Sequence, residues 1–243
     1  GYQDYAKYRS DPSKEASSQL SPYFHSGQIS THEVFDKISE LESWSPEFIN
    51  PEMVGRREGW WGSSENFESF MDELITWREL GYHTCVRRAN YNQYSSLPEW
   101  AIKTLHEHSS DEREHIYSLD ELTYSQTHDE IWNAAQNQLR TQGVIQNYLR
   151  MLWGKKILEW TPNPQIALSY MITLNDRYSL DGRDPNSYSG VFWILGRYDR
   201  AWGPERSIFG KIRYMTSDST ARKFNLKPYL EQWGNESLGV TTS

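Results

Sequence analysis

The chain has 243 residues, of which 11 are tryptophan and 14% are aromatic, and its formal net charge is −8. Its one cysteine, Cys85, excludes an internal disulfide and any zinc or iron–sulfur site built on paired cysteines. Mean hydropathy is −0.82, and no apolar run approaches the roughly 20 residues that a membrane helix needs. We expect a cytoplasmic, monomeric protein that contacts no membrane.

The charge is unevenly distributed along the chain. Residues 1–139 hold 11 basic and 24 acidic side chains, whereas residues 140–243 hold 14 and 9. A net negative charge argues against non-specific binding of nucleic acid. However, eight lysines and arginines gather within residues 197–228. The sequence therefore predicts an acidic first part and a mildly basic second part.

Helical periodicity dominates, and no run alternates with the period of a strand, which predicts an all-α fold. In chain order we expect helices over residues 30–41, 65–80, 99–108, 129–142, 144–160 and 164–174. Ser30 and Asp129 stand where helices begin, and Pro98 stands at the first turn of another. Gly143 and Pro162 stand where helices end. We expect ordered loops over 176–190 and 196–207, and flexible ends at 1–4 and 236–243.

The tryptophans of two neighbouring helices have a regular spacing. Trp153 and Trp160 are two helical turns apart and share a face, and Trp132 on the preceding helix is placed to pack beside them. One interpretation is an aromatic stripe in the core. The other is a series of oxidisable rings through which electrons hop to a buried redox cofactor, because tryptophan is readily oxidised.

Other patterns leave alternatives open. The segment 181–186 (DGRDPN) lacks the spacing of a calcium loop, so Asp181 either pairs with a buried arginine or lies in an exposed turn. The seven histidines lack a convincing ligand spacing, and we expect no metal. Basic and aromatic residues alternate over 193–214, a pattern that suits contact with phosphates and bases or a solvated charged face.

Six segments in this order resemble one family. They are 20–30 (LSPYFHSGQIS), 73–80 (ELITWREL), 127–136 (THDEIWNAAQ), 150–160 (RMLWGKKILEW), 174–186 (LNDRYSLDGRDPN) and 209–215 (FGKIRYM). Over about residues 5–230 the chain is similar to the flavin-binding domain of DNA photolyases, most closely those of class II. The resemblance implies a single all-helical FAD-binding domain spanning residues 1–243. It also implies light-driven repair of cyclobutane pyrimidine dimers in ultraviolet-damaged DNA, and for a prokaryotic source it implies association with the nucleoid.

The resemblance also implies a role for individual residues toward the cofactor, whose reduced form is the active one. The stretch 17–21 would hold the pyrophosphate and ribitol, Tyr5 (less readily Tyr8) would contact phosphate, and Asn175 would face flavin N5. Arg150 and Asp181 would form a buried ion pair against the flavin ring. The full implied cofactor set is Tyr5, Ser17, Ser18, Gln19, Leu20, Ser21, Arg78, Arg150, Asn175, Asp181 and Arg183.

For the reaction and the DNA, the resemblance implies three further sets. The catalytic set is Asn175, Arg150, Asp181 and Glu73, and the electron-transfer set is Trp153, Trp132 and Trp160. Glu73 would hydrogen-bond the dimer, and Trp77 would pack on it. The substrate and DNA set is Glu73, Trp77, Asn147, Met151, Trp193, Arg197, Arg200, Lys211 and Arg213; its four basic residues rest on the charge pattern more than on a motif.

The chain also departs from the family pattern. Photolyases usually carry an N-terminal antenna domain, and we expect neither that domain nor an antenna pigment here. Gln146 and Asn147 stand where class II members usually have His-Gly, and Ser26 replaces a phenylalanine. Two alternatives therefore stay open: a cryptochrome-like photoreceptor without repair activity, and a fragment that binds FAD poorly. The dimer-pocket residues argue against the photoreceptor.

Overall fold

The computed structural model describes residues 2–14, 16–56 and 58–235. Within these residues all regular secondary structure is helical, apart from one isolated bridge between Arg206 and Gly210. The all-α prediction is therefore confirmed. No helix in the described part of the chain is long and apolar enough to cross a membrane.

The elements are joined by connections of very different length, the longest lying between Ile194 and Ser217. In chain order they are η1 (Tyr2–Asp4), α1 (Tyr5–Tyr8), α2 (Ser21–His25), α3 (Thr31–Leu41), η2 (Pro46–Phe48), η3 (Pro51–Met53), α4 (Glu65–Met71), the π-helical η4 (Asp72–Trp77), α5 (Arg78–Arg87), η5 (Tyr94–Ser96), α6 (Glu99–Glu107), α7 (Leu119–Thr123), α8 (Glu130–Gln142), α9 (Asn147–Glu159), α10 (Pro164–Tyr178), α11 (Pro185–Ile194), α12 (Ser217–Lys223) and α13 (Lys227–Trp233).

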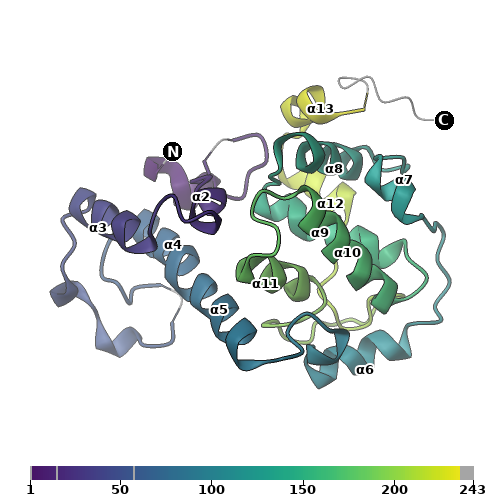
Figure 1. Cartoon of the computed structure of the whole chain (residues 1–243), viewed down its shortest axis with the longest axis horizontal. Coiled ribbons are helices and arrows are strands. Elements are labelled where there is room, and N and C mark those ends of the chain that lie inside the picture. The colour runs from purple at the N-terminus through teal and green to yellow at the C-terminus, as the bar shows by residue number, and fades with distance from the viewer. Residues whose placement is uncertain (1, 15, 57, 236–243) are drawn as a thin grey trace.

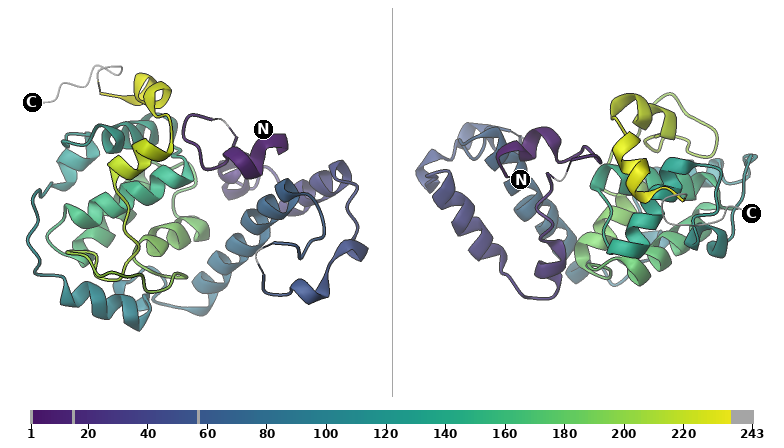
Figure 2. Two further views of the ribbon diagram at one scale, coloured as in Figure 1. Left: turned by 180° about the vertical axis from the view of Figure 1, so that it is seen from behind. Right: turned by 90° about the horizontal axis from the view of Figure 1, so that it is seen from above.

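These elements form two lobes, which lie side by side in Figures 1 and 2. The N-terminal lobe, residues 2–87, packs α1, α3 and α4 around a small core of Tyr5, Val34, Phe67, Phe70, Met71 and Leu74. The C-terminal lobe, residues 88–235, has a much larger core centred on α8, α9, α10 and α11. The helical run α4–η4–α5 leads from one lobe to the other, and α5 packs on α11.

Several predicted helix ends are confirmed by their local chemistry. Ser30 precedes α3, and its hydroxyl accepts the N–H of Glu33 at 3.0 Å. Asp129 caps α8 by accepting the N–H of Trp132 at 3.0 Å, and Gly143 ends that helix with a φ of 72°. A left-handed backbone of this kind suits glycine because it has no Cβ. The predicted loop 196–207 is irregular, as expected.

Other helix boundaries differ from prediction. The helix expected over 144–160 begins only at Asn147, because the Gln146 side chain takes the N–H groups of Tyr148 and Leu149. The prediction of a loop over 176–190 is wrong for most of these residues, which are helical. Helix α10 continues to Tyr178, and α11 begins at Pro185 after the side chain of Asp184 caps it. The helix expected over 65–80 likewise runs on to Arg87, through the π-helical turn.

Flexible ends are predicted at 1–4 and 236–243, and of these the structure describes residues 2–4. Residues 236–243 and Gly1 are outside the described residues. Residues 2–4 form η1, where the Tyr2 ring meets Phe70 edge-on at a centroid distance of 5.9 Å and its hydroxyl donates to Glu42 at 2.9 Å. The start of the described chain is thus fastened to the N-terminal lobe.

Candidate functional site

Arg150 and Asp181 come from different elements and interact through their charges. Arg150 is half-buried on α9, and Asp181 follows α10. Burial acts to raise the pKa of Asp181, but the Arg150 cation and hydrogen bonds from Ser179 and Ser21 outweigh it, so the pKa lies below its ordinary value. The contact with Ser21 brings the first residue of α2 to this charge pair.

The carboxylate of Asp176 holds the residues around the Arg150–Asp181 pair through hydrogen bonds. Asn175 is 3% exposed on the last turns of α10, and its amide nitrogen donates to Asp176 at 3.3 Å. Asp176 also accepts the backbone N–H of Arg183 at 3.1 Å and the hydroxyl of Tyr188 at 3.3 Å. Asp176 therefore links the end of α10 to the turn before α11, and it fixes the place of the Asn175 amide.

The stretch 17–21 runs over the surface of the molecule. Ser17, Ser18, Gln19 and Ser21 are exposed and Leu20 is half-buried. Gln19 has a φ of 54°, and Arg183, two residues after Asp181, has a φ of 69°. Non-glycine residues rarely adopt this backbone, and such residues cluster at ligand sites. The Arg78 guanidinium lies 5.2 Å from the centre of the Phe24 ring and donates to the Tyr82 hydroxyl.

Glu73 on η4 is paired with a residue that the sequence did not single out. Its carboxylate forms an ion pair with Arg9, whose guanidinium also lies 5.8 Å from the centre of the Tyr5 ring. Burial, followed by the charge of Glu73, raises the pKa of Tyr5 to about 12. The backbone oxygen of Arg9 accepts from the Gln146 side chain at 2.7 Å, which ties this group to the start of α9.

The two tryptophans predicted to contact the lesion come from η4 and α11. Trp77 at the end of η4 is half-buried, donates to Asp72 at 3.1 Å and meets the ring of Tyr198 edge-on at 6.2 Å. Trp193 on α11 is half-buried, with the Lys155 and Arg213 cations 5.6 and 5.1 Å from its ring centre. Of the other two residues predicted for this pocket, Met151 is half-buried and Asn147 is exposed.

The four basic residues predicted to contact phosphates do not share one environment. Arg200 is exposed, Lys211 pairs with Glu205 at 3.2 Å, and Arg213 pairs with Asp199 at 3.1 Å. Arg197 differs from the expected surface cation. It is 4% exposed, it stacks 3.8 Å from the Phe192 ring centre, and it donates to the backbone oxygen of Tyr91. It is therefore part of the core and not available to a phosphate.

The three tryptophans of the predicted series are buried together. Trp132 is 0% exposed, and Trp153 and Trp160 are each 2% exposed. The Trp132 indole N–H donates to the backbone oxygen of Trp153 at 2.9 Å, and its ring meets Trp160 edge-on at a centroid distance of 5.7 Å. The Trp153 indole donates to Gln136 at 2.8 Å. The rings thus form part of the core; Trp132 and Trp160 are in ring contact, and Trp153 is joined to Trp132 through a hydrogen bond of its backbone.

Two residues of the site escaped the sequence analysis although a signal was present. Arg9 stands four residues after Tyr5, the spacing that places side chains on one helical face. Lys155 lies within the quoted segment 150–160. It is completely buried and donates to the backbone oxygen of Ile194, the last residue of α11. Among the described residues, no group of three or more His, Cys, Asp or Glu side chains could hold a metal.

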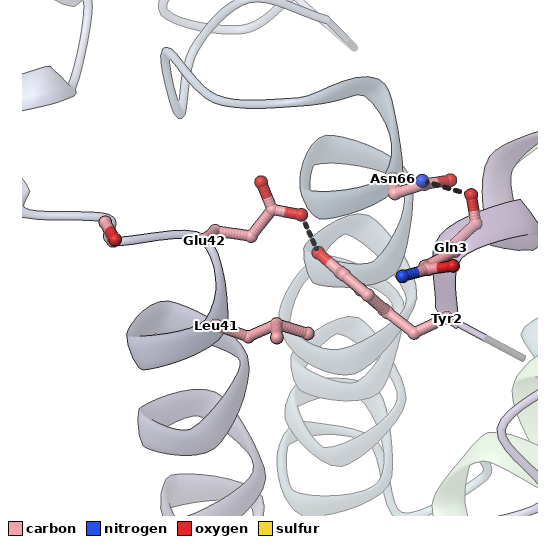
Figure 3. A pocket seen from close by; sticks show the side chains of 6 residues that line it. Tyr2, Gln3, Leu41, Glu42 and Asn66 are labelled. Carbon is pink, nitrogen blue, oxygen red and sulfur yellow. Dashed lines mark hydrogen bonds between the residues drawn. The ribbon is translucent and has the colours of Figure 1, made fainter.

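A cavity of about 350 Å³ in the N-terminal lobe lies apart from all of these residues. Figure 3 shows it between η1, the end of α3 and the start of α4, with the Tyr2 hydroxyl directed at Glu42 and the Asn66 amide at the backbone oxygen of Gln3. These hydrogen bonds are 2.9 and 2.8 Å long. They fasten η1 to the lobe, and no residue of the predicted site lines this cavity.

Comparison with known proteins gives close relatives. The chain is 44% identical over 228 residues to a deoxyribodipyrimidine photo-lyase of Methanothermobacter thermautotrophicus, a match that covers 94% of this chain and 46% of that protein. It is 41% identical to the deoxyribodipyrimidine photo-lyase of Arabidopsis thaliana (93% and 42% covered) and 40% identical to that of Potorous tridactylus (91% and 38% covered). The chain thus spans less than half the length of these relatives. No family model matches it.

The crystal structure of a bacterial class III photolyase from Agrobacterium tumefaciens has the same fold. The TM-score is 0.64 over 95% of this chain and 41% of that chain, at 16% sequence identity. The fold therefore defines an all-helical domain of the photolyase type. Together with the sequence relatives, it shows that the chain corresponds to the FAD-binding helical domain of photolyases.

Proposed function

We propose that this chain binds FAD and uses it to repair cyclobutane pyrimidine dimers in DNA under blue light, as a deoxyribodipyrimidine photolyase of class II. The observation that carries the proposal is the junction of Arg150, Asp181 and Ser21, which brings α9, the turn after α10 and the start of α2 to one charge pair. The class II assignment rests on the sequence motifs. The alternative is a cryptochrome-like photoreceptor without repair activity, which the repair assay below distinguishes from a photolyase.

The residues of this junction suit FAD in their chemistry. Exposed hydroxyl and backbone donors over 17–21 and the Arg78 guanidinium match the needs of a pyrophosphate. The left-handed backbone of Gln19 and Arg183 is a cost of order 1–3 kcal/mol each that a bound ligand would justify. Asp181, ionised because of Arg150, and the buried amide of Asn175 would face the polar edge of a flavin. When bound and reduced, FAD would supply the photoexcited electron donor for the reaction.

The chain's own residues would orient the reactants and shield them from water. Arg150 would favour negative charge on a neighbouring reduced ring, and Asp181 keeps that cation from being left unpaired in a partly buried place. The Asn175 amide can both donate and accept a hydrogen bond, so it suits a ring atom in either protonation state. These roles concern the cofactor side of the site.

On the lesion side, aromatic and charged groups would receive a dimer that has been turned out of the duplex. A damaged base pair stacks poorly, which lowers the cost of this step. Trp77 and Trp193 offer ring faces, and Glu73 offers a carboxylate held in place by Arg9. Arg200, Lys211 and Arg213 remain suited to the DNA backbone, and such contacts make affinity fall as salt rises.

The repair proposal is tested by illumination of the FAD-loaded, reduced protein with an oligonucleotide that contains one thymine dimer. We expect dimers to disappear under blue light and to persist in the dark, with Trp193→Ala weakening lesion binding by roughly 1–3 kcal/mol, the usual size of a stacking contribution. Leu180→Ala, a change at a side chain that is 59% exposed on the surface, serves as the control. Reduced flavin without repair would exclude a photolyase and favour the photoreceptor.

The tryptophan series is tested separately from repair. Trp153→Phe should slow light-driven reduction of oxidised FAD, because it replaces the ring expected nearest the flavin by one that is harder to oxidise. Repair by chemically reduced protein should persist in this variant. Equal rates of photoreduction in the variant and the wild type would remove Trp153 from the series.

A further inference from the structure

An aromatic and histidine cluster contacts the outer end of the tryptophan series. Tyr117, in the segment before α7, meets Trp160 edge-on at a centroid distance of 5.4 Å, and its backbone N–H donates to the Trp160 oxygen at 3.0 Å. His128 lies 5.2 Å from Trp160, and His115 lies 4.0 Å from His128, between ring centroids. None of these three residues has a role in the function proposed above.

The hydrogen bonds of Tyr117 suit the loss of a proton. Its hydroxyl oxygen lies 2.7 Å from Nδ1 of His128 and also accepts the backbone N–H of His128 at 3.1 Å. Because the oxygen already accepts one hydrogen bond, the arrangement that satisfies both groups has the phenol donating to Nδ1. A phenol that loses an electron becomes strongly acidic, so a base in this position lowers the free energy of its oxidation.

We propose that Tyr117 is the terminal electron donor of the series and that His128 accepts its proton. The inference rests on the proposed function, since its oxidant is a Trp160 radical cation formed when tryptophan electrons pass to photoexcited FAD. One electron moves from Tyr117 to Trp160, which becomes neutral tryptophan again. The phenolic proton moves to Nδ1 of His128, which leaves a neutral tyrosyl radical and an imidazolium.

The surroundings keep His128 ready to accept that proton. Burial, followed by the neighbouring His115, lowers the pKa of His128 below its ordinary 6.5; Lys156 acts in the same direction, while Asp129 and Glu159 oppose it. Lys156 is itself paired with Glu159 at 2.9 Å. The imidazole is therefore neutral at neutral pH. It borders a cavity of about 430 Å³, which His115 and Trp160 also line, and it is exposed, so the proton can pass on to solvent.

Laser-flash absorption and electron paramagnetic resonance of the FAD-loaded, oxidised protein test this assignment. The wild type should form a neutral tyrosyl radical, and Tyr117→Phe should leave a tryptophan radical in its place. His128→Gln keeps a hydrogen-bond acceptor but removes the base, and tyrosine oxidation should slow by about 100-fold, the contribution of a positioned proton acceptor. Tyr124→Phe, at a tyrosine that is 50% exposed, should behave as the wild type.

The pH dependence adds a readout that a structural role would not change. The tyrosyl yield of the wild type should persist through neutral pH and fall only in acid, beyond the pH at which an ordinary histidine takes up its proton, once His128 is protonated and cannot accept. A tryptophan radical with the same decay in the wild type and in Tyr117→Phe, beside normal flavin reduction, would overturn this inference alone. Absence of flavin photoreduction in the wild type would overturn the tryptophan series and this inference with it, whereas failure of the chemically reduced protein to repair dimers would overturn the proposed function.

Discussion

The two lobes differ in charge, in the size of their cores and in the exposure of the predicted site residues that they carry. Residues 1–87 hold 8 basic and 15 acidic side chains, whereas residues 88–243 hold 17 and 18. The N-terminal lobe has a core of six buried residues, and most of its predicted ligand contacts are exposed polar groups. The C-terminal lobe buries the tryptophan series within its large core.

This difference agrees with the two kinds of work proposed for the site. Electron transfer between rings requires fixed distances, and a close-packed interior provides them. Ligand contacts must be reachable, so they lie on a surface segment that the rest of the fold positions. The charge pattern points the same way, because the more acidic lobe would repel DNA and the phosphate contacts are expected on the C-terminal lobe.

The largest expected effect is a loss of stability, which we compare for one buried tryptophan from each lobe. Trp132→Ala empties a site that is 0% exposed and should lower the free energy of unfolding by about 3–5 kcal/mol. Trp44→Ala, at a half-buried ring stacked on Phe67 at 5.4 Å, should cost about 1–3 kcal/mol. Urea unfolding of both variants measures the difference, and a larger loss at Trp44 would reverse the proposed order of the two cores.

A glycine pair tests how closely the C-terminal core is packed. A Cβ at Gly154 on α9 would overlap Cδ1 of Ile194, which is fully buried on α11, whereas a Cβ at Gly190 would have no neighbour within 4 Å. Gly154→Ala should therefore destabilise the protein by about 1–3 kcal/mol. Gly190→Ala should stabilise it by about 0.5–1 kcal/mol through helix propensity. Thermal unfolding that gave both variants the same sign would contradict this contact.

The buried Lys155 side chain is expected to make the stability of the protein depend on pH. Burial lowers its pKa to about 7, against an ordinary value of 10.5. Between these values the unfolded chain holds a proton that the folded chain has released, so stability rises with pH. Relative to Lys155→Met, the wild type should gain about 1–2 kcal/mol between about pH 7 and pH 9. Lys103→Met, at a side chain that is 78% exposed, should show no such trend, and parallel curves for Lys155→Met would refute the shift.

The smallest expected effects concern the helix caps. Ser30→Ala at α3 removes one side-chain hydrogen bond and should cost about 0.5–1 kcal/mol. Asp129→Ala at α8 removes the cap, a contact with the Ser217 hydroxyl and a charge 4.0 Å from Lys156, and should cost about 1–2 kcal/mol. Equal losses in chemical unfolding would mean that Asp129 acts as a cap alone.

Local signals predicted the long helices well. The caps at Ser30 and Asp129 and the glycine at 143 acted as their chemistry requires, because each satisfies groups within its own turn. Helix α11 was missed although Asp184-Pro185 is itself a start signal; the glycine, serine and asparagine around it outweighed that pair. The late start of α9 follows from the cap by the Gln146 side chain, and the π-helical turn of η4 interrupts a run that periodicity reads as one α-helix; neither is contained in the hydrophobic period.

The candidate site was predictable to a similar degree. Arg150 and Asp181 were expected as a buried ion pair; the charge of Arg150, which is half-buried, lowers the pKa of Asp181, and the ion pair itself stays a prediction. Arg197 was expected at the surface because it stands in a basic run, but its guanidinium is held inside by the Tyr91 backbone and the Phe192 ring. The pairing of Arg9 with Glu73 joins residues 64 positions apart, which no local pattern specifies.

The central claim is that the two lobes together hold one FAD that blue light can reduce. An absorption spectrum of the protein mixed with FAD and freed of excess, recorded before and after blue light with a reductant present, tests this most directly. We predict one FAD per chain and loss of the oxidised flavin bands on illumination, but not in the dark. A colourless protein, or flavin bands that light leaves unchanged, would contradict the account.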